Sequence, residues 1–189
     1  MGLFDFRPIL MTNMPDKHAL RRALLAERQA IDGEVRRRRD ETIGERVLAR
    51  FRSQPVRSLG VYWPIRNEPD LRPIYPQLAA LGMQLALPVV LERAAPLGFA
   101  VWTPGEPLAK DALGLAVPAK VVEIRPEALL IPCLGFNAHK VRLGYGGGFY
   151  DRTLAAVPRP LAVGVAYANA LVEFEADAHD IALDAVITD

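Results

Sequence analysis

One stretch of the chain, residues 129–157, combines three features whose order constrains the fold. It begins with a short apolar run, Leu129 to Ile131, which a proline closes, and a run of this length between turn residues predicts a buried strand rather than a helix. A glycine-rich loop follows. A helical pattern then resumes at Phe149 and continues to about Val157, where Pro158 ends it. The predicted order is strand, glycine loop, helix.

The glycine loop is suited to binding phosphate. Gly146, Gly147 and Gly148 are consecutive, so backbone N–H groups can converge on an anion without interference from Cβ atoms, and the following helix turns its positive end toward that anion. Arg142 would add a cation that can bind phosphate through two hydrogen bonds. The spacing matches neither of the two common nucleotide-binding fingerprints. By themselves, the glycines are equally consistent with a flexible turn.

Other residues of the same stretch favour a binding site over a plain turn. They are polar or aromatic, and a simple linker would not need them: Arg142, Tyr145, Tyr150, Asp151 and Arg152.

Composition excludes several classes of protein. The chain has 189 residues, of which 51% are hydrophobic, and this is enough for one domain with a sizeable core. It carries 23 Lys and Arg against 22 Asp and Glu, so the net charge of +1 gives no general attraction to nucleic acid or acidic membranes. No apolar run approaches the roughly 20 residues that cross a bilayer. We therefore expect no nucleic-acid or membrane partner.

The single cysteine, Cys133, cannot form an internal disulfide and indicates a reducing compartment. It lies beside the predicted strand, which favours a small core residue over a nucleophile. The three histidines are far apart in sequence and lack metal-ligand spacing, so zinc is not supported. Residues 1–15 have no signal-peptide pattern, and we expect them to form a flexible N-terminal extension of a single domain that spans residues 16–189.

Two helices are predicted near the start of that domain. The first begins at Asp16, with Leu20, Leu24 and Ile31 near one face and the basic residues Lys17, Arg21 and Arg28 on others. Lys17 and Arg21 are four residues apart, so they project from the same side, where two cations could hold a polyphosphate or simply form a solvated basic face. A second helix begins near Glu34, after Asp32-Gly33, and Ile43, Val47 and Phe51 give it a buried face.

The remaining pattern alternates strands with helices. Strands are expected over 56–64, 83–90, 97–103, 160–167 and 184–188, and a helix over 70–81 that Gly82 ends; residues 104–126 are expected to lack regular structure. Such alternation predicts an α/β fold, a single-domain three-layer sandwich with a mostly parallel, Rossmann-like central sheet.

The loop that follows the 56–64 strand carries two further candidates. Trp63 is most commonly a half-buried core residue, but beside a loop it could form the flat wall of a site for a pterin ring. Glu68 could be a surface acid. Residues alone leave both alternatives open.

The signature of a known family can be followed through this chain. The run Pro132-Cys133-Leu134-Gly135-Phe136-Asn137, and then Arg142-Leu143-Gly144-Tyr145-Gly146-Gly147-Gly148-Phe149-Tyr150-Asp151-Arg152, resembles the signature of the 5-formyltetrahydrofolate cyclo-ligase family, also called 5,10-methenyltetrahydrofolate synthetase. Supporting matches cover most of the chain: Lys17-x-x-x-Arg21, Tyr62-Trp63-Pro64 with Glu68, and His179-Asp180-Ile181-Ala182-Leu183-Asp184. The central motif is long and specific, whereas the others are individually weak.

The resemblance implies a ligase that closes a ring in 5-formyltetrahydrofolate with ATP and Mg²⁺, on a fold similar to that of sugar-phosphate isomerases and CoA-transferases. It implies catalytic roles for Arg142, Tyr150 and Asp151, and Mg²⁺ ligation by Asp151 and Asp180. It implies folate contacts from Trp63, Glu68, Tyr145 and Phe149. It implies ATP contacts from Lys17, Arg21, Arg142, Gly144, Tyr145, Gly146, Gly147, Gly148, Phe149 and Tyr150.

The chain departs from the family pattern at three places. Val117-Pro118-Ala119 replaces a usual Glu-Pro pair, Ala170 replaces a frequent Gln, and Glu175 a frequent Pro. These departures concern substrate specificity, not the phosphate loop.

Two other functions remain open from the sequence: a sugar-phosphate isomerase or CoA-transferase-like enzyme, and a non-catalytic folate- or nucleotide-binding paralogue. We expect a cytoplasmic monomer that acts on small molecules.

Overall fold

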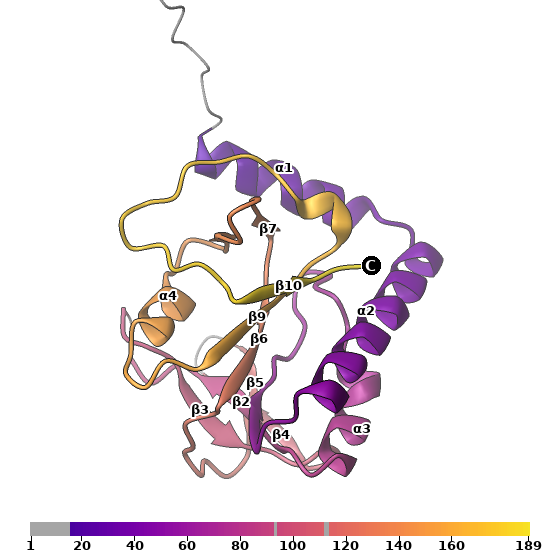
Figure 1. The fold of residues 1–189 in the computed structure, drawn as a ribbon, viewed down its shortest axis with the longest axis vertical. Coiled ribbons are helices and arrows are strands. Elements are labelled where there is room, and N and C mark those ends of the chain that lie inside the picture. Colours follow the sequence, from indigo (N-terminus) through magenta and orange to yellow (C-terminus); the bar gives the residue numbers. More distant parts are fainter. Residues whose placement is uncertain (1–15, 93, 112–113) are drawn as a thin grey trace, which may run out of the picture.

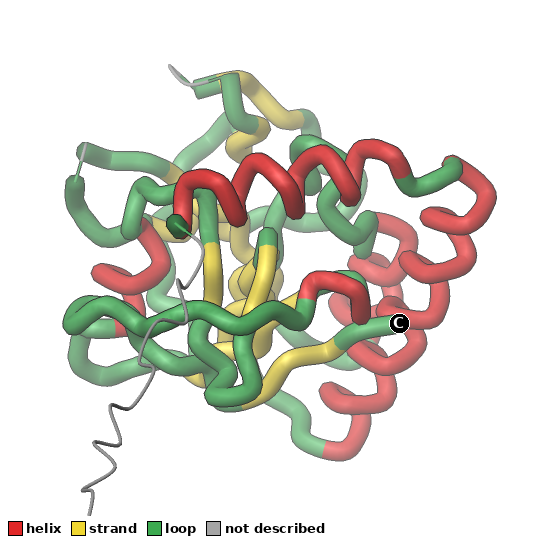
Figure 2. The backbone as a smooth tube through the Cα atoms, turned by 90° about the horizontal axis from the view of Figure 1, so that it is seen from above, coloured by secondary structure: helices red, strands yellow, loops and turns green. Residues whose placement is uncertain are grey.

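A computed structural model describes residues 16–92, 94–111 and 114–189, and the expected N-terminal extension, 1–15, lies outside them. The described chain forms a six-stranded sheet between layers of helices (Figures 1 and 2). The strand order is β10-β9-β6-β1-β2-β3; all neighbours pair in parallel except β3, which is antiparallel to β2. The strands are β1 (Ser58–Gly60), β2 (Gln84–Val89), β3 (Gly98–Val101), β6 (Ala128–Pro132), β9 (Leu161–Val165) and β10 (Ala185–Ile187). The predicted α/β sandwich with a mostly parallel sheet is confirmed.

Helices cover both faces of the sheet. On one face, α2 (Gly33–Ser53) and α3 (Tyr75–Ala80) share a buried core with Leu130 of β6, and on the other α4 (Phe149–Leu154) places Leu154 against Leu129 and Ile131. Successive residues of β6 therefore face opposite layers, as the period of a strand requires. This double burial explains why β6 is apolar throughout.

The first helix, α1 (Lys17–Ala30), begins where the sequence predicts, because the Asp16 side chain accepts a hydrogen bond from the His18 amide. Asp32 caps α2 in the same way. Figure 1 shows that α1 lies across one end of the sheet rather than on a face. That end carries the loops that leave the carboxyl ends of β1, β6 and β9, so α1 is placed to contact all three.

The structure corrects the prediction that residues 104–126 lack regular structure. They contain a hairpin of β4 (Leu108–Lys110) and β5 (Ala116–Pro118). A second hairpin, β7 (Gly135–Phe136) with β8 (Arg142–Leu143), lies in the stretch predicted to be a loop. These strands have two or three residues, which is too few to show an alternating pattern.

Two predicted helices are shorter than expected. The 70–81 segment divides into a 3₁₀ turn, η1 (Arg72–Ile74), followed by α3, because Pro73 and Pro76 lack the N–H donors that a continuous helix needs. The helix predicted to reach Val157 ends as α4 at Leu154; its last turn tightens, and a residue before a proline disfavours the helical conformation. Another 3₁₀ turn, η2 (Ala168–Ala170), follows β9.

Candidate functional site

A cavity of about 520 Å³ lies at the carboxyl end of the parallel strands, where ligands of open α/β sheets bind. Its walls come from α1, the turn after β1, the β4–β5 hairpin, the glycine loop and the segment 177–180. Every residue that the sequence assigned to a site lines this cavity: Lys17, Arg21, Trp63, Glu68, Arg142, Gly144, Tyr145, Gly146, Gly147, Gly148, Phe149, Tyr150, Asp151 and Asp180. The structure thus brings all of these residues to one cavity, while their individual roles stay predictions.

The glycine loop forms one wall of the cavity. Gly146 and Gly148 have φ angles of 95° and 63°, a left-handed conformation that residues with a Cβ rarely adopt. Gly147 does not have a positive φ; its constraint is space, since a Cβ there would lie 2.9 Å from the Phe149 ring. Because α4 has only six residues, its dipole is small, so the contribution of a helix end to anion binding is weaker than the sequence predicted.

Two cations of α1 line the cavity, and one of them contacts the glycine loop. Arg21 Nε donates a hydrogen bond to the Gly144 carbonyl at 2.9 Å. Lys17 Nζ lies 2.7 Å from an Asp177 carboxylate oxygen and 2.9 Å from one of Asp180. Burial alone would lower the pKa of Lys17, but its hydrogen bonds to Asp177 and Asp180 raise it. Lys17 is therefore a fixed positive charge.

Arg142 is a buried residue of β8 and not, as the sequence predicted, a residue of the glycine loop. Its Nη2 lies 2.8 Å from an Asp151 carboxylate oxygen, and its guanidinium lies 5.3 Å from the centre of the Tyr150 ring. The side chains of Arg142 and Asp151 are 7% and 18% exposed, so water screens this pair little. Burial raises the pKa of Tyr150, whose phenol is therefore neutral near pH 7.

The opposite wall of the cavity contains Glu68, only 4% exposed. One of its oxygens accepts a hydrogen bond from the Tyr145 hydroxyl at 3.0 Å, and the other from the Ile65 amide at 3.0 Å. Burial raises the pKa of Glu68, while the Ile65 amide, the charge of Arg28 and the Tyr145 hydroxyl oppose that rise. The Glu68 carboxylate therefore has defined protein partners and free lone pairs for a ligand.

The position of Trp63 is compatible with both alternatives that the sequence left open, a core residue and a wall of the site. It is half-buried, its ring lies edge-on to that of Trp102 with centres 5.8 Å apart, and it also lines the cavity. It can therefore offer an aromatic surface to a flat ligand while it stays anchored in the core.

The two acids expected to hold a metal lie in the same cavity. The amide of Ile181, the residue after Asp180, lies 3.5 Å from an Asp151 carboxylate oxygen, so the two segments meet. No group of three or more His, Cys, Asp or Glu residues able to hold a metal occurs within residues 16–92, 94–111 and 114–189. The protein can thus offer two carboxylates, which suits a Mg²⁺ ion completed by phosphate oxygens and water.

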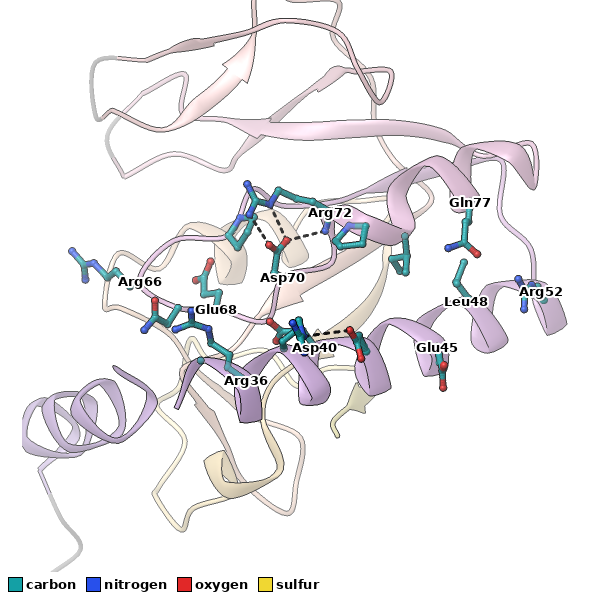
Figure 3. Close-up of a pocket in the computed structure, with 17 residues that line it drawn as sticks. Arg36, Asp40, Glu45, Leu48, Arg52, Arg66, Glu68, Asp70, Arg72 and Gln77 are labelled. Atoms are coloured by element: carbon teal, nitrogen blue, oxygen red, sulfur yellow. Dashed lines mark hydrogen bonds and ion pairs between the residues drawn. The ribbon is translucent and has the colours of Figure 1, made fainter. Parts of the chain in front are cut away.

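A second cleft, of about 1050 Å³, lies between α2 and the turn that carries Glu68 (Figure 3). Five arginines and five carboxylates line it, so it has no net attraction for an anion. Arg66 and Glu68 line both cavities, which makes their turn the wall between them.

Sequence reasoning missed three residues near the cavity. Arg28 is only 5% exposed, although the sequence predicted only that it lies off the apolar face of its helix. Its spacing from Lys17 and Arg21, eleven and seven residues, would have shown that all three share one helix face. Asp177 pairs with Lys17, and Arg66 lies 5.0 Å from the centre of the Tyr145 ring. No pattern in the sequence indicates these last two contacts.

The three departures from the family pattern differ in their distance from the cavity. Val117 packs with Val89 and Ala100, and its neighbour Ala116 lines the cavity, so the β4–β5 hairpin gives that wall an apolar surface. Ala170 is buried against β6 and β9 residues, and neither it nor Glu175 lines the cavity.

Comparison with known proteins decides the family. A model described as the 5-formyltetrahydrofolate cyclo-ligase family matches residues 13–189. The chain belongs to this family. A 5-formyltetrahydrofolate cyclo-ligase from Mycolicibacterium smegmatis is 32% identical over 185 residues, which cover 91% of this chain and 93% of that protein.

Two solved structures of 5,10-methenyltetrahydrofolate synthetases share the fold of this cyclo-ligase family member. The protein from Mycoplasma pneumoniae matches with a TM-score of 0.78 and 25% identity, covering 92% of this chain and 98% of its own. The protein from Aquifex aeolicus matches with a TM-score of 0.75 and 30% identity, covering 91% and 89%. None of the helices in the described part of the chain has the length and apolar content needed to cross a membrane.

Proposed function

We propose that this chain catalyses the ATP-dependent conversion of 5-formyltetrahydrofolate to 5,10-methenyltetrahydrofolate, with release of ADP and phosphate. Family membership supports this reaction. The observation that carries it in the structure is a single cavity with two unlike walls: a glycine loop with Lys17, Arg21 and Arg142, and a wall with Glu68 and Trp63. One wall suits a polyphosphate and the other a flat ring that donates hydrogen bonds.

ATP supplies the phosphoryl group that converts the formyl oxygen of the substrate into a leaving group, after which N10 closes the ring and phosphate leaves. The protein has little covalent chemistry to perform and must position two ligands and spread phosphate charge. We assign this role to the loop amides of Gly146, Gly147 and Gly148 and to the cations Lys17, Arg21 and Arg142, all of which line the cavity. We propose that the Arg142 guanidinium, which pairs with Asp151, also donates a hydrogen bond to a phosphate oxygen.

On the folate side, Glu68 can accept hydrogen bonds from the donor edge of the pterin, and Trp63, Tyr145 and Phe149 offer aromatic surfaces beside it. Tyr150 faces the same cavity with a neutral phenol, so it can donate a hydrogen bond but cannot act as a base at neutral pH. These groups hold the ring and limit the access of water to the reacting atoms.

Asp151 and Asp180 are the residues that would hold Mg²⁺, which would supply positive charge to the phosphate oxygens. The protein itself keeps these carboxylates beside Arg142 and Lys17, so cations already surround the proposed position of the phosphates. We further propose a monomer in the cytoplasm with small-molecule partners only.

An absorbance assay for methenyltetrahydrofolate, with and without ATP, tests the proposal. We expect product only when both 5-formyltetrahydrofolate and ATP are present. A non-catalytic paralogue would bind the ligands and form no product. A sugar-phosphate isomerase would need a base for proton abstraction near the glycine loop, and its reaction would not consume ATP.

The Glu68→Gln variant should raise the KM for 5-formyltetrahydrofolate by about 10-fold to 100-fold, the range expected for loss of a hydrogen bond to a charged group. An amide presents one acceptor oxygen instead of two, so either Tyr145 or Ile65 also loses its acceptor. Steady-state kinetics with each substrate varied should show the KM for ATP nearly unchanged.

The matched control is Glu45→Gln, an exposed acid of the second cleft, which should leave both constants unaltered. If the Glu68→Gln variant raises only the KM for ATP, Glu68 contacts the nucleotide and not the folate.

Asp151→Asn and Asp180→Asn should each raise the Mg²⁺ concentration needed for half-maximal turnover. If both residues serve one ion, the double variant should lose less free energy of activation than the sum of the single losses. A Mg²⁺ titration of all four proteins gives the comparison, with Asp184→Asn, outside the cavity, as control.

Asp180 also accepts a hydrogen bond from the Asp177 amide at 2.8 Å, so it has a structural alternative. If the losses of activation free energy add, or if Asp180→Asn lowers only the Tm, Asp180 has a structural role in that turn. Asp151 would then be the only one of the two acids that binds the metal.

A further inference from the structure

Arg28 is a charged side chain in the interior, 5% exposed, at the C-terminal end of α1. A turn of about 100° per residue places it within roughly 20° of Lys17 and 20° of Arg21 around the helix axis. The helix face that carries Lys17 and Arg21 therefore also carries a third cation, which lies eleven residues beyond Lys17, or about 16 Å along the helix axis. A solvated basic face would not bury an arginine.

The partner of Arg28 is the hydroxyl of Tyr145, a residue of the glycine loop 117 positions away, and the guanidinium carbon lies 5.7 Å from the centre of the Tyr145 ring. An arginine has donors only, so the hydroxyl oxygen must accept from Arg28 and its own hydrogen must point elsewhere. That hydrogen is directed to Glu68, whose oxygen lies 3.0 Å away. The direction of the Tyr145 hydroxyl is thus fixed by Arg28.

Two further atoms of Arg28, Nε and Nη1, are buried without a hydrogen-bond partner among the described residues. A buried cation with incomplete hydrogen bonds is unfavourable for folding alone, because its desolvation is not fully compensated. Such a residue is better explained by its effect on the neighbouring site than by stability.

We propose that Arg28 is a positioning residue for the folate site, which acts through Tyr145 to hold the Glu68 carboxylate ionised and correctly oriented for the substrate. This inference rests on the proposed function, since it requires Glu68 to bind 5-formyltetrahydrofolate. It also links the two walls of the cavity, because Tyr145 belongs to the glycine loop while Glu68 belongs to the turn after β1. Tyr145 therefore connects Arg28 of α1 with Glu68.

The charges that act on Glu68 can be enumerated. Arg28 comes from α1, Arg66 from its own turn, and both stabilise the carboxylate. The other titratable groups whose pKa is influenced by Glu68 have a pKa raised above the usual value, so they are neutral near pH 7: Tyr62, Tyr75, Cys133, Tyr145 and Tyr150. The charges of Arg28 and Arg66 therefore both oppose the effect of burial on the pKa of Glu68.

The affinity for folate should depend on pH. Burial raises the pKa of Glu68, and the carboxylate is the form that binds the substrate, so the KM for 5-formyltetrahydrofolate should rise as the pH falls through that pKa. Removal of Arg28 should raise the pKa further. The inflection in the plot of log KM against pH should then move to higher pH.

The experiment measures this profile for the full-length wild type and for Arg28→Gln, Arg28→Lys and Tyr145→Phe, with Arg22→Gln, an exposed arginine of the same helix, as control. In Arg28→Gln we expect the inflection to move to higher pH. The KM for folate should rise about 10-fold at the low-pH end of the profile. The KM for ATP should change much less. Arg28→Lys should restore part of the effect, and Arg22→Gln should match the wild type.

A second readout needs no turnover. Carbon-13 NMR of the side-chain carboxyl of Glu68, assigned by its loss in Glu68→Gln, should show a higher pKa in Arg28→Gln than in the wild type. If Arg28→Gln fails to fold, Tyr145→Phe, which removes only the hydroxyl, should show the same upward direction. An unchanged Glu68 pKa in the folded variants would overturn the proposal, whereas a raised pKa in a protein without cyclo-ligase activity would contradict the proposed function and not this link.

Discussion

Replacing Gly147 by valine is expected to reduce turnover by about 10²-fold to 10³-fold, the loss measured when one preorganised donor is removed from an active site. A Cβ at this position would lie 2.9 Å and 3.0 Å from two atoms of the Phe149 ring, so the ring or the loop must move. Either movement displaces the backbone amides that we propose bind the phosphate. Single-turnover kinetics at saturating ATP should show the loss in the chemical step.

A control separates this effect from a general loss of stability. Gly105 has a φ of 97° but open space around the position of a Cβ, and it does not line the cavity, so Gly105→Ala strains the backbone without touching the site. We expect a lower Tm with wild-type turnover for Gly105→Ala. Near-normal turnover of a folded Gly147→Val protein would show that the loop is a plain turn.

Arg142→Ala is expected to weaken ATP binding by about 10-fold to 100-fold and also to lower the free energy of unfolding by about 3 kcal/mol. The first effect follows from loss of a charge-assisted contact to phosphate. The second follows from the position of Arg142 in β8. Its removal leaves the largely buried Asp151 carboxylate without the ion pair that it forms with Arg142 at 2.8 Å. Nucleotide titration by calorimetry and urea denaturation measure the two effects separately.

The matched variant is Arg159→Ala, which breaks the ion pair with Asp184 outside the cavity. Both of its side chains are 35% exposed, so we expect a loss of less than about 1 kcal/mol and unaltered ATP affinity. An Arg142→Ala protein that folds and binds ATP normally would remove Arg142 from the nucleotide site.

Much of the fold could be predicted because its signals are local. The apolar run at β6, the Asp16 and Asp32 caps and the Gly82 stop each encode their element within a few residues. The β4–β5 and β7–β8 hairpins escaped prediction because strands of two or three residues carry no periodicity. The prolines at 73 and 76 divided a helix that the apolar pattern alone would have made continuous.

The candidate site divides in the same way. The glycine loop, Arg142 and Asp151 lie within ten residues, so the motif shows them together. Asp180 and Glu68 required the family resemblance, because the sheet topology brings them to the cavity from distant segments. The contact of Arg28 with Tyr145 spans 117 residues and depends on where α1 crosses the sheet end, which no sequence pattern specifies.

The most direct test of the proposed chemistry follows the formyl oxygen. With 5-formyltetrahydrofolate labelled with oxygen-18 in the formyl group, transfer of the γ-phosphoryl group to that oxygen must carry the label into the released phosphate, one atom for each methenyltetrahydrofolate formed. Mass spectrometry of the phosphate should therefore show one heavy oxygen per turnover. Unlabelled phosphate, with the heavy oxygen recovered in water, would contradict activation of the formyl group by ATP in this cavity.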